Sequence, residues 1–146
     1  MKIQNKTFFL LASVLSMFLG GMIYLLWRPQ NLVMFSWCRS IGILNFIRWM
    51  RDAVLFDLPA WFVYSLPQAL WCFSGLCCIH AIWNQKDGER FWLSSVFLGS
   101  LSIEFMQLFH VISGTFDAVD FVFIVLFYCL FELSTQIFKG ESHEEI

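Results

Sequence analysis

The sequence predicts an all-α membrane protein with four transmembrane helices and one amphipathic helix at the membrane interface. Of its 146 residues, 59% are hydrophobic and 14% are charged, whereas an average soluble domain has about 25% charged residues. A soluble domain of this size cannot bury so much apolar surface. Four apolar stretches reach the length of about 20 residues that a membrane span needs. We therefore expect a single transmembrane helical domain over residues 1–146.

The first two predicted spans contain no charged residue and run from about Thr7 to Trp27 and from about Ala60 to Trp83. Lys2 and Lys6 precede the first span as in a signal peptide, but no small-residue cleavage site follows, so we expect an uncleaved anchor. Pro67 lies inside the second span, where a proline bends a helix and can open a pocket.

The third and fourth predicted spans carry acidic residues. They run from about Phe91 to Val111 and from about Phe116 to Phe138. Backbone groups cannot stay unpaired in hydrocarbon, so each span should be an α-helix. Ionisable groups inside a span normally face the bundle interior and have partners there. The acids of these spans are Glu104, Asp117, Asp120 and Glu132.

The connection between the first two spans contains a predicted amphipathic helix, from about Ile43 to Phe56. At 100° per residue its apolar side carries Phe46, Trp49, Met50, Ala53 and Phe56, and its polar side carries Asn45, Arg48, Arg51 and Asp52. Two interpretations stay open. The apolar stripe lies in the bilayer interface with the arginines near lipid phosphates, or it packs against the end of the bundle.

Four spans place both ends of the chain on one side of the membrane. The lysines and arginines divide five to four between the sides, which hardly decides the orientation. The compact polar loop from Asn84 to Arg90 is typical of a cytoplasmic hairpin. We expect the termini on the cytoplasmic side.

Charge and cysteine content exclude some classes of function. The formal net charge is −2 and the basic residues are scattered, so we expect no nucleic-acid partner. Five cysteines do not suggest a disulfide framework. Cys77 and Cys78, near His80, form a poor metal site because adjacent residues point about 100° apart on a helix. We expect neither a metal nor another cofactor.

Polar side chains of the last two spans form two stripes that a tight connection brings together. The second span adds polar residues nearest the same membrane face, and Arg48 or Arg51 is positioned to approach from the connecting segment. An alternative is that Asp117 and Asp120 only cap a helix. The predicted ligand-binding residues are Tyr64, Gln68, Glu104, Gln107, His110, Asp117 and Asp120.

The stretch from Ser102 to Asp120, SIEFMQLFHVISGTFDAVD, resembles the VanZ-like family in its Glu, Gln and Gly-Thr-Phe-Asp pattern. Asp57-Leu58-Pro59 and Tyr64-Ser65-Leu66-Pro67 add to the likeness, while Gly114 replaces a basic residue common in the family and indicates a distant branch. The resemblance implies a small multi-pass protein of the bacterial cytoplasmic membrane, with its motif at the outer face and its named member linked to glycopeptide resistance. It implies no established reaction.

We therefore expect a protein that binds an envelope lipid or cell-wall precursor at the outer face. No Ser-His or Cys-His pair is evident, so binding is favoured over catalysis, and whether the protein is an enzyme stays open. One alternative is a non-catalytic accessory subunit whose polar stripes hold a membrane protein partner. A proton-coupled carrier that uses Glu104 and Glu132 is a third hypothesis, which the absence of inverted repeats disfavours.

Overall fold

The computed structural model describes residues 3–83, 86–112 and 116–141, which form six helices and no strands. The all-α prediction is confirmed. The helices are α1 (Ile3–Trp27), α2 (Val33–Ser40), α3 (Leu44–Asp52), α4 (Ala60–Trp83), α5 (Glu89–Leu108) and α6 (Ala118–Glu141). Helices α1, α4, α5 and α6 are long and apolar enough to cross a membrane, as expected for a multi-pass membrane protein.

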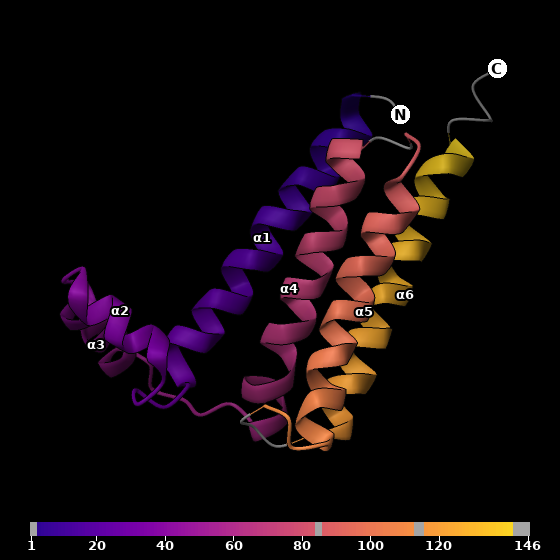
Figure 1. Ribbon diagram of the computed structural model, residues 1–146. Coiled ribbons are helices and arrows are strands. Elements are labelled where there is room, and N and C mark those ends of the chain that lie inside the picture. Colours follow the sequence, from indigo (N-terminus) through magenta and orange to yellow (C-terminus); the bar gives the residue numbers. More distant parts are fainter. Residues whose placement is uncertain (1–2, 84–85, 113–115, 142–146) are drawn as a thin grey trace.

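The four long helices run alternately up and down, and α4 is the central one (Figure 1). It packs against α1 on one side and against α5 and α6 on the other. The first turn of α1 and the last turn of α6 lie at the same end of the bundle, which we call the termini end. At the other end, the far end, α1 and α5 finish and α4 and α6 begin.

Small residues let α1 and α4 approach closely. Gly20 of α1 lies against the Trp71 ring and the Pro67 carbonyl of α4. The approach is so close that a Cβ atom at position 20 would be 2.6 Å from Trp71 Nε1. Ser74 Oγ donates to the Ser13 carbonyl oxygen at 2.8 Å. Apolar residues on the outer surface of the long helices are exposed, as lipid contact requires.

Helix α5 ends at Leu108, three residues before the predicted limit. His110 adopts a positive φ of 57°, and its N–H donates to the Gln107 carbonyl while the Val111 N–H donates to the Met106 carbonyl. These two bonds form a Schellman motif, which closes a helix through one left-handed residue. Residues 113–115, within the stretch from Ser102 to Asp120, lie outside the described residues, and with them the predicted turn.

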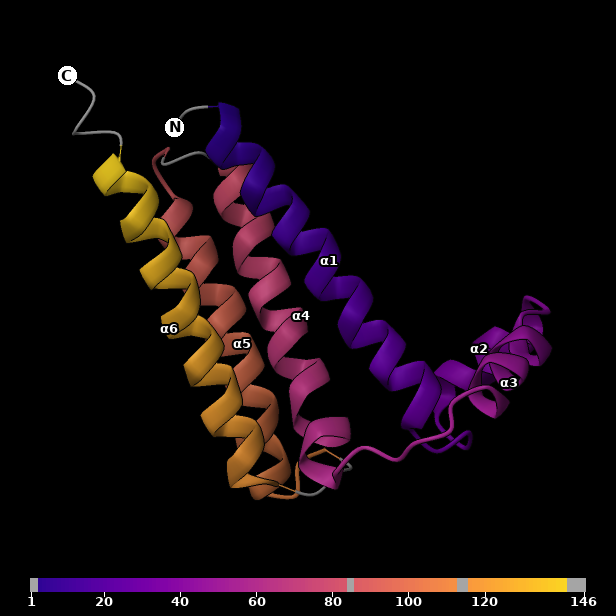
Figure 2. The ribbon, with the colours of Figure 1, turned by 180° about the vertical axis from the view of Figure 1, so that it is seen from behind.

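The segment between α1 and α4 forms a small lobe of two helices, α2 and α3, beside the end of α1 (Figure 2). We had not predicted α2, and α3 ends at Asp52, four residues before the predicted limit. Their buried contact contains Phe35, Cys38, Leu44 and Ile47. Phe46 and Trp49 are 60% and 66% exposed. The prediction that the apolar stripe packs against the end of the bundle is therefore wrong for Phe46 and Trp49, whereas Phe56 contacts the Trp27 ring of α1 at 5.6 Å between ring centres.

Candidate functional site

A cavity of about 320 Å³ opens at the far end of the bundle, where α4, α5, α6 and Arg28, the residue after α1, contribute polar side chains. We call it the Arg28 cavity. It joins the end of α1, the first half of α4, the end of α5 and the start of α6. Its lining residues are Arg28, Ala60, Trp61, Tyr64, Gln68, Gln107, Asp117 and Asp120.

The structure brings six of the seven predicted site residues together. Five of them line the Arg28 cavity, and Glu104 lies behind the wall in contact with one of the five. His110 is exposed and does not line the cavity. It serves the Schellman turn instead, because the helix on which it was predicted to continue the polar stripe has already ended.

Glu104 is fully buried and connects α5 to α4. Its Oε1 atom accepts a hydrogen bond of 2.9 Å from Gln68 Nε2, which also lies 3.5 Å from the Ser100 carbonyl oxygen. Its second carboxyl oxygen, Oε2, is buried and makes no close hydrogen bond among the described residues, although the Asp117 backbone N–H lies near enough to act on the carboxyl group. A buried oxygen of this kind costs free energy unless something else binds it.

The two aspartates of α6 have different surroundings. Asp117 Oδ1 accepts a hydrogen bond of 2.9 Å from the Val119 N–H, so Asp117 caps the helix, as the capping alternative predicts. Asp120 Oδ1 is buried without a partner among the described residues. Ser65 and Arg28 lie close enough to act on the Asp120 carboxyl group. Capping therefore accounts for Asp117 and leaves Asp120 for another role.

Arg28 supplies the positive charge of the cavity, although it is not among the site residues predicted from the sequence. Its guanidinium carbon lies 4.3 Å from the centre of the Tyr64 ring, a cation–π arrangement. Arg51, which we had placed near the site, instead donates to the Leu25 and Arg28 carbonyl oxygens. The sequence position of Arg28 could have indicated its role. Arg28 directly follows the first span, at the membrane face where the second span begins.

Buried polar atoms without partners concentrate around this cavity. Within the described ranges, the buried side-chain nitrogen and oxygen atoms without a hydrogen bond are Arg28 Nε, Ser65 Oγ, Glu104 Oε2 and Asp120 Oδ1. All four belong to the lining residues or their direct neighbours. Buried polar groups in proteins are almost always paired. The arrangement therefore offers two donor groups, the Arg28 guanidinium and the Ser65 hydroxyl, and two carboxyl groups as acceptors to a polar molecule.

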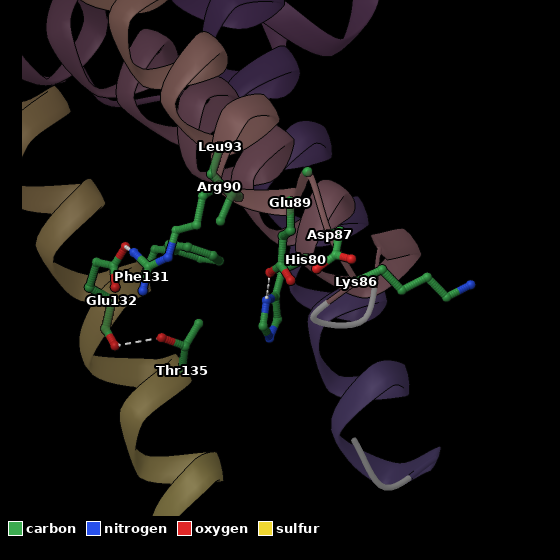
Figure 3. Close-up of a pocket in the computed structure, with 10 residues that line it drawn as sticks. His80, Lys86, Asp87, Glu89, Arg90, Leu93, Phe131, Glu132 and Thr135 are labelled. Atoms are coloured by element: carbon green, nitrogen blue, oxygen red, sulfur yellow. Dashed lines mark hydrogen bonds and ion pairs between the residues drawn. The ribbon is translucent and has the colours of Figure 1, made fainter.

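The termini end holds a second cavity of about 310 Å³, the His80 cavity (Figure 3). His80 Nδ1 and Glu89 Oε1 are 2.5 Å apart, and both residues are more than 90% buried. On the facing wall Glu132 accepts a hydrogen bond from Tyr128 and lies 3.6 Å from Arg90. The remaining lining residues are Lys86, Asp87, Gly88, Leu93, Phe131 and Thr135.

Sequence reasoning missed the pair of His80 and Glu89. The signal was the short connection between α4 and α5, which places the end of one helix beside the start of the next. Among the residues that the structure describes, no three His, Cys, Asp or Glu side chains are grouped so that they could hold a metal ion.

No family model, curated protein or solved structure matches this chain. The resemblance to the VanZ-like family therefore stays a prediction, and the fold and the cavities are established by the structure of the chain itself.

Proposed function

We propose that the Arg28 cavity binds the polar headgroup of an envelope lipid or of a lipid-linked cell-wall precursor. The observation that carries this proposal is the group of four unpartnered polar atoms around one cavity at the far end. A headgroup with a phosphate and several hydroxyl or amine groups complements them. The phosphate pairs with the Arg28 guanidinium, and the hydroxyl or amine protons are donated to the acidic side chains.

The position of the cavity favours a lipid over a ligand dissolved in water. Trp61 and Tyr64 line it and are 48% and 42% exposed at the start of α4. Aromatic side chains of this kind sit at the headgroup level of a membrane. A lipid can therefore place its headgroup in the cavity while its acyl chains stay in the bilayer.

The compact polar loop between the second and third spans and the VanZ-like resemblance favour the outer face for this end of the bundle. With the termini in the cytoplasm, the Arg28 cavity opens toward the outer leaflet of a bacterial cytoplasmic membrane. Envelope lipids and membrane-bound cell-wall precursors are present in that leaflet.

The test is mass spectrometry of the lipids that remain with the gently extracted protein. We compare the wild type with the Glu104→Gln, Asp120→Asn double variant, which keeps side-chain size and removes both acids. Glu132→Gln is the matched control, because it removes an acid of α6 at the termini end. We expect one lipid species to fall about tenfold in the double variant, equivalent to about 1.4 kcal/mol, and to be unchanged in the control.

The second candidate is a non-catalytic accessory subunit, and the hydrogen bond between Gln68 and Glu104 favours it as a link between helices. In that case the same protein partner is retained by the wild type and the double variant, and no lipid is lost selectively. That outcome would reject headgroup binding.

A further inference from the structure

The lobe of α2 and α3 carries an apolar outer surface that no part of the described chain covers. Val33, Trp37 and Ile41 follow one another at intervals of four residues from the start of α2 and are 66% to 69% exposed. On α3 the rings of Phe46 and Trp49 stack at 5.8 Å and are similarly exposed. These five residues, three exposed on α2 and two exposed on α3, are together called the lobe surface. A helix pair with its own core does not need this surface for folding.

The lobe is attached to the end of α1 by specific contacts. Arg51 Nη1 donates to the Leu25 and Arg28 carbonyl oxygens at 2.8 Å each. Trp27 Nε1 donates to the Phe56 carbonyl oxygen at 3.2 Å. These contacts fix the lobe beside the last turn of α1, where a spanning helix leaves the hydrocarbon (Figures 1 and 2).

The charge of the lobe complements an anionic membrane surface. Residues 28–57 contain four arginines and two aspartates, so their formal charge is 4 − 2 = +2. Arg39 and Arg48 are exposed on the same two helices as the lobe surface. A helix with apolar aromatic residues and nearby arginines is typical of segments that lie in the interface of anionic bilayers.

We propose that the lobe surface docks on anionic phospholipid in the leaflet that borders the Arg28 cavity. Trp37, Phe46 and Trp49 enter the boundary between headgroups and acyl chains, and Arg39 and Arg48 bind lipid phosphates. A lipid surface is favoured over a protein because the segment carries a formal charge of +2 and is attached to the end of α1, a helix long and apolar enough to cross a membrane. Because Arg51 bonds the Arg28 carbonyl, docking also holds Arg28 at its cavity. The proposal does not depend on a ligand in that cavity.

The experiment measures tryptophan fluorescence of the full chain in lipid nanodiscs whose acyl chains are brominated near the headgroup. The difference in quenching between the wild type and the Trp37→Phe, Trp49→Phe variant reports on the lobe. Discs contain phosphatidylcholine alone or mixed with phosphatidylglycerol. We expect the difference to be at least about twofold larger in the anionic discs, since each arginine near such a surface strengthens binding about fivefold.

Arg39→Gln combined with Arg48→Gln should remove the increase in the quenching of the lobe tryptophans that phosphatidylglycerol causes. Arg90→Gln is the matched control, because Arg90 is exposed at the termini end, and it should keep that dependence. Equal quenching in both kinds of disc would overturn the proposal. The proposal would also be overturned if bromine quenched the lobe tryptophans in neither kind of disc. That result would indicate that a second copy of the chain or another protein covers the lobe surface.

Discussion

The two cavities lie at opposite ends of the same helices and differ in how their polar groups are satisfied. In the His80 cavity the buried imidazole and carboxyl group pair with each other, and Glu132 has both Tyr128 and Arg90 beside it. In the Arg28 cavity and directly behind it, four buried polar atoms have no partner in the described part of the chain. The volumes of the two cavities are nearly equal, so size does not distinguish one cavity from the other.

Helix α5 contains the clearest form of this contrast. It places Glu89 in contact with the His80 cavity and Glu104 behind the wall of the Arg28 cavity, and both are buried. One acid has an imidazole partner, whereas the other has an amide on one oxygen and, within the described ranges, no close hydrogen bond on the second. Burial of an acid in a span therefore does not by itself mark a ligand site. The unpaired oxygen is the more specific sign.

The largest expected effect is the loss of stability in Glu89→Leu. Leucine keeps much of the side-chain volume and leaves His80 Nδ1 buried without its partner, so we expect a loss of about 3 kcal/mol in the free energy of unfolding. The measurement is thermal or denaturant unfolding in one fixed detergent. Asp87→Leu, in the preceding loop where the side chain is exposed, is the control. A Glu89→Leu protein as stable as the wild type would show that the pair is not structural.

A smaller loss, of about 2 kcal/mol, is expected for Gly20→Ala. The new Cβ atom would lie 2.6 Å from Trp71 Nε1 and 3.2 Å from the Pro67 carbonyl oxygen, so α1 and α4 must separate or the ring must move. Tyr24 also contacts Trp71, at 5.6 Å between ring centres. The displacement should therefore reach the Arg28 cavity and spare the His80 cavity.

Gly21→Ala provides the matched control for this change, because a Cβ atom at position 21 meets nothing within 4 Å. We expect Gly20→Ala to lower both the unfolding temperature and the amount of retained lipid, and Gly21→Ala to leave both unchanged. Equal behaviour of the two variants would contradict the close approach of α1 and α4 at Gly20.

Helical periodicity was enough to predict the four spans and most of the Arg28 cavity. Gln107 and Asp120 lie on regular helices joined by a tight connection, so their relative placement follows from geometry. Periodicity failed at His110, because a left-handed turn interrupts the helix. It also gave no indication of Arg28, whose position depends on the α2–α3 lobe and on the bond from Arg51. Such contacts between distant segments have no local pattern in a sequence.

The smallest expected effect comes from the same substitution at the other acid of α5, Glu104→Leu. The change removes an acid whose Oε2 atom has no partner in the described ranges, while Gln68 keeps its approach to the Ser100 carbonyl oxygen. We expect the free energy of unfolding to change by less than about 1 kcal/mol or to rise, because removing the cost of burying the unpaired Oε2 atom offsets the loss of the hydrogen bond from Gln68. Unfolding is measured beside Glu89→Leu in the same detergent. If Glu104→Leu is as unstable as Glu89→Leu, then Glu104 holds the helices together, and the two ends of the bundle do not differ in the way proposed.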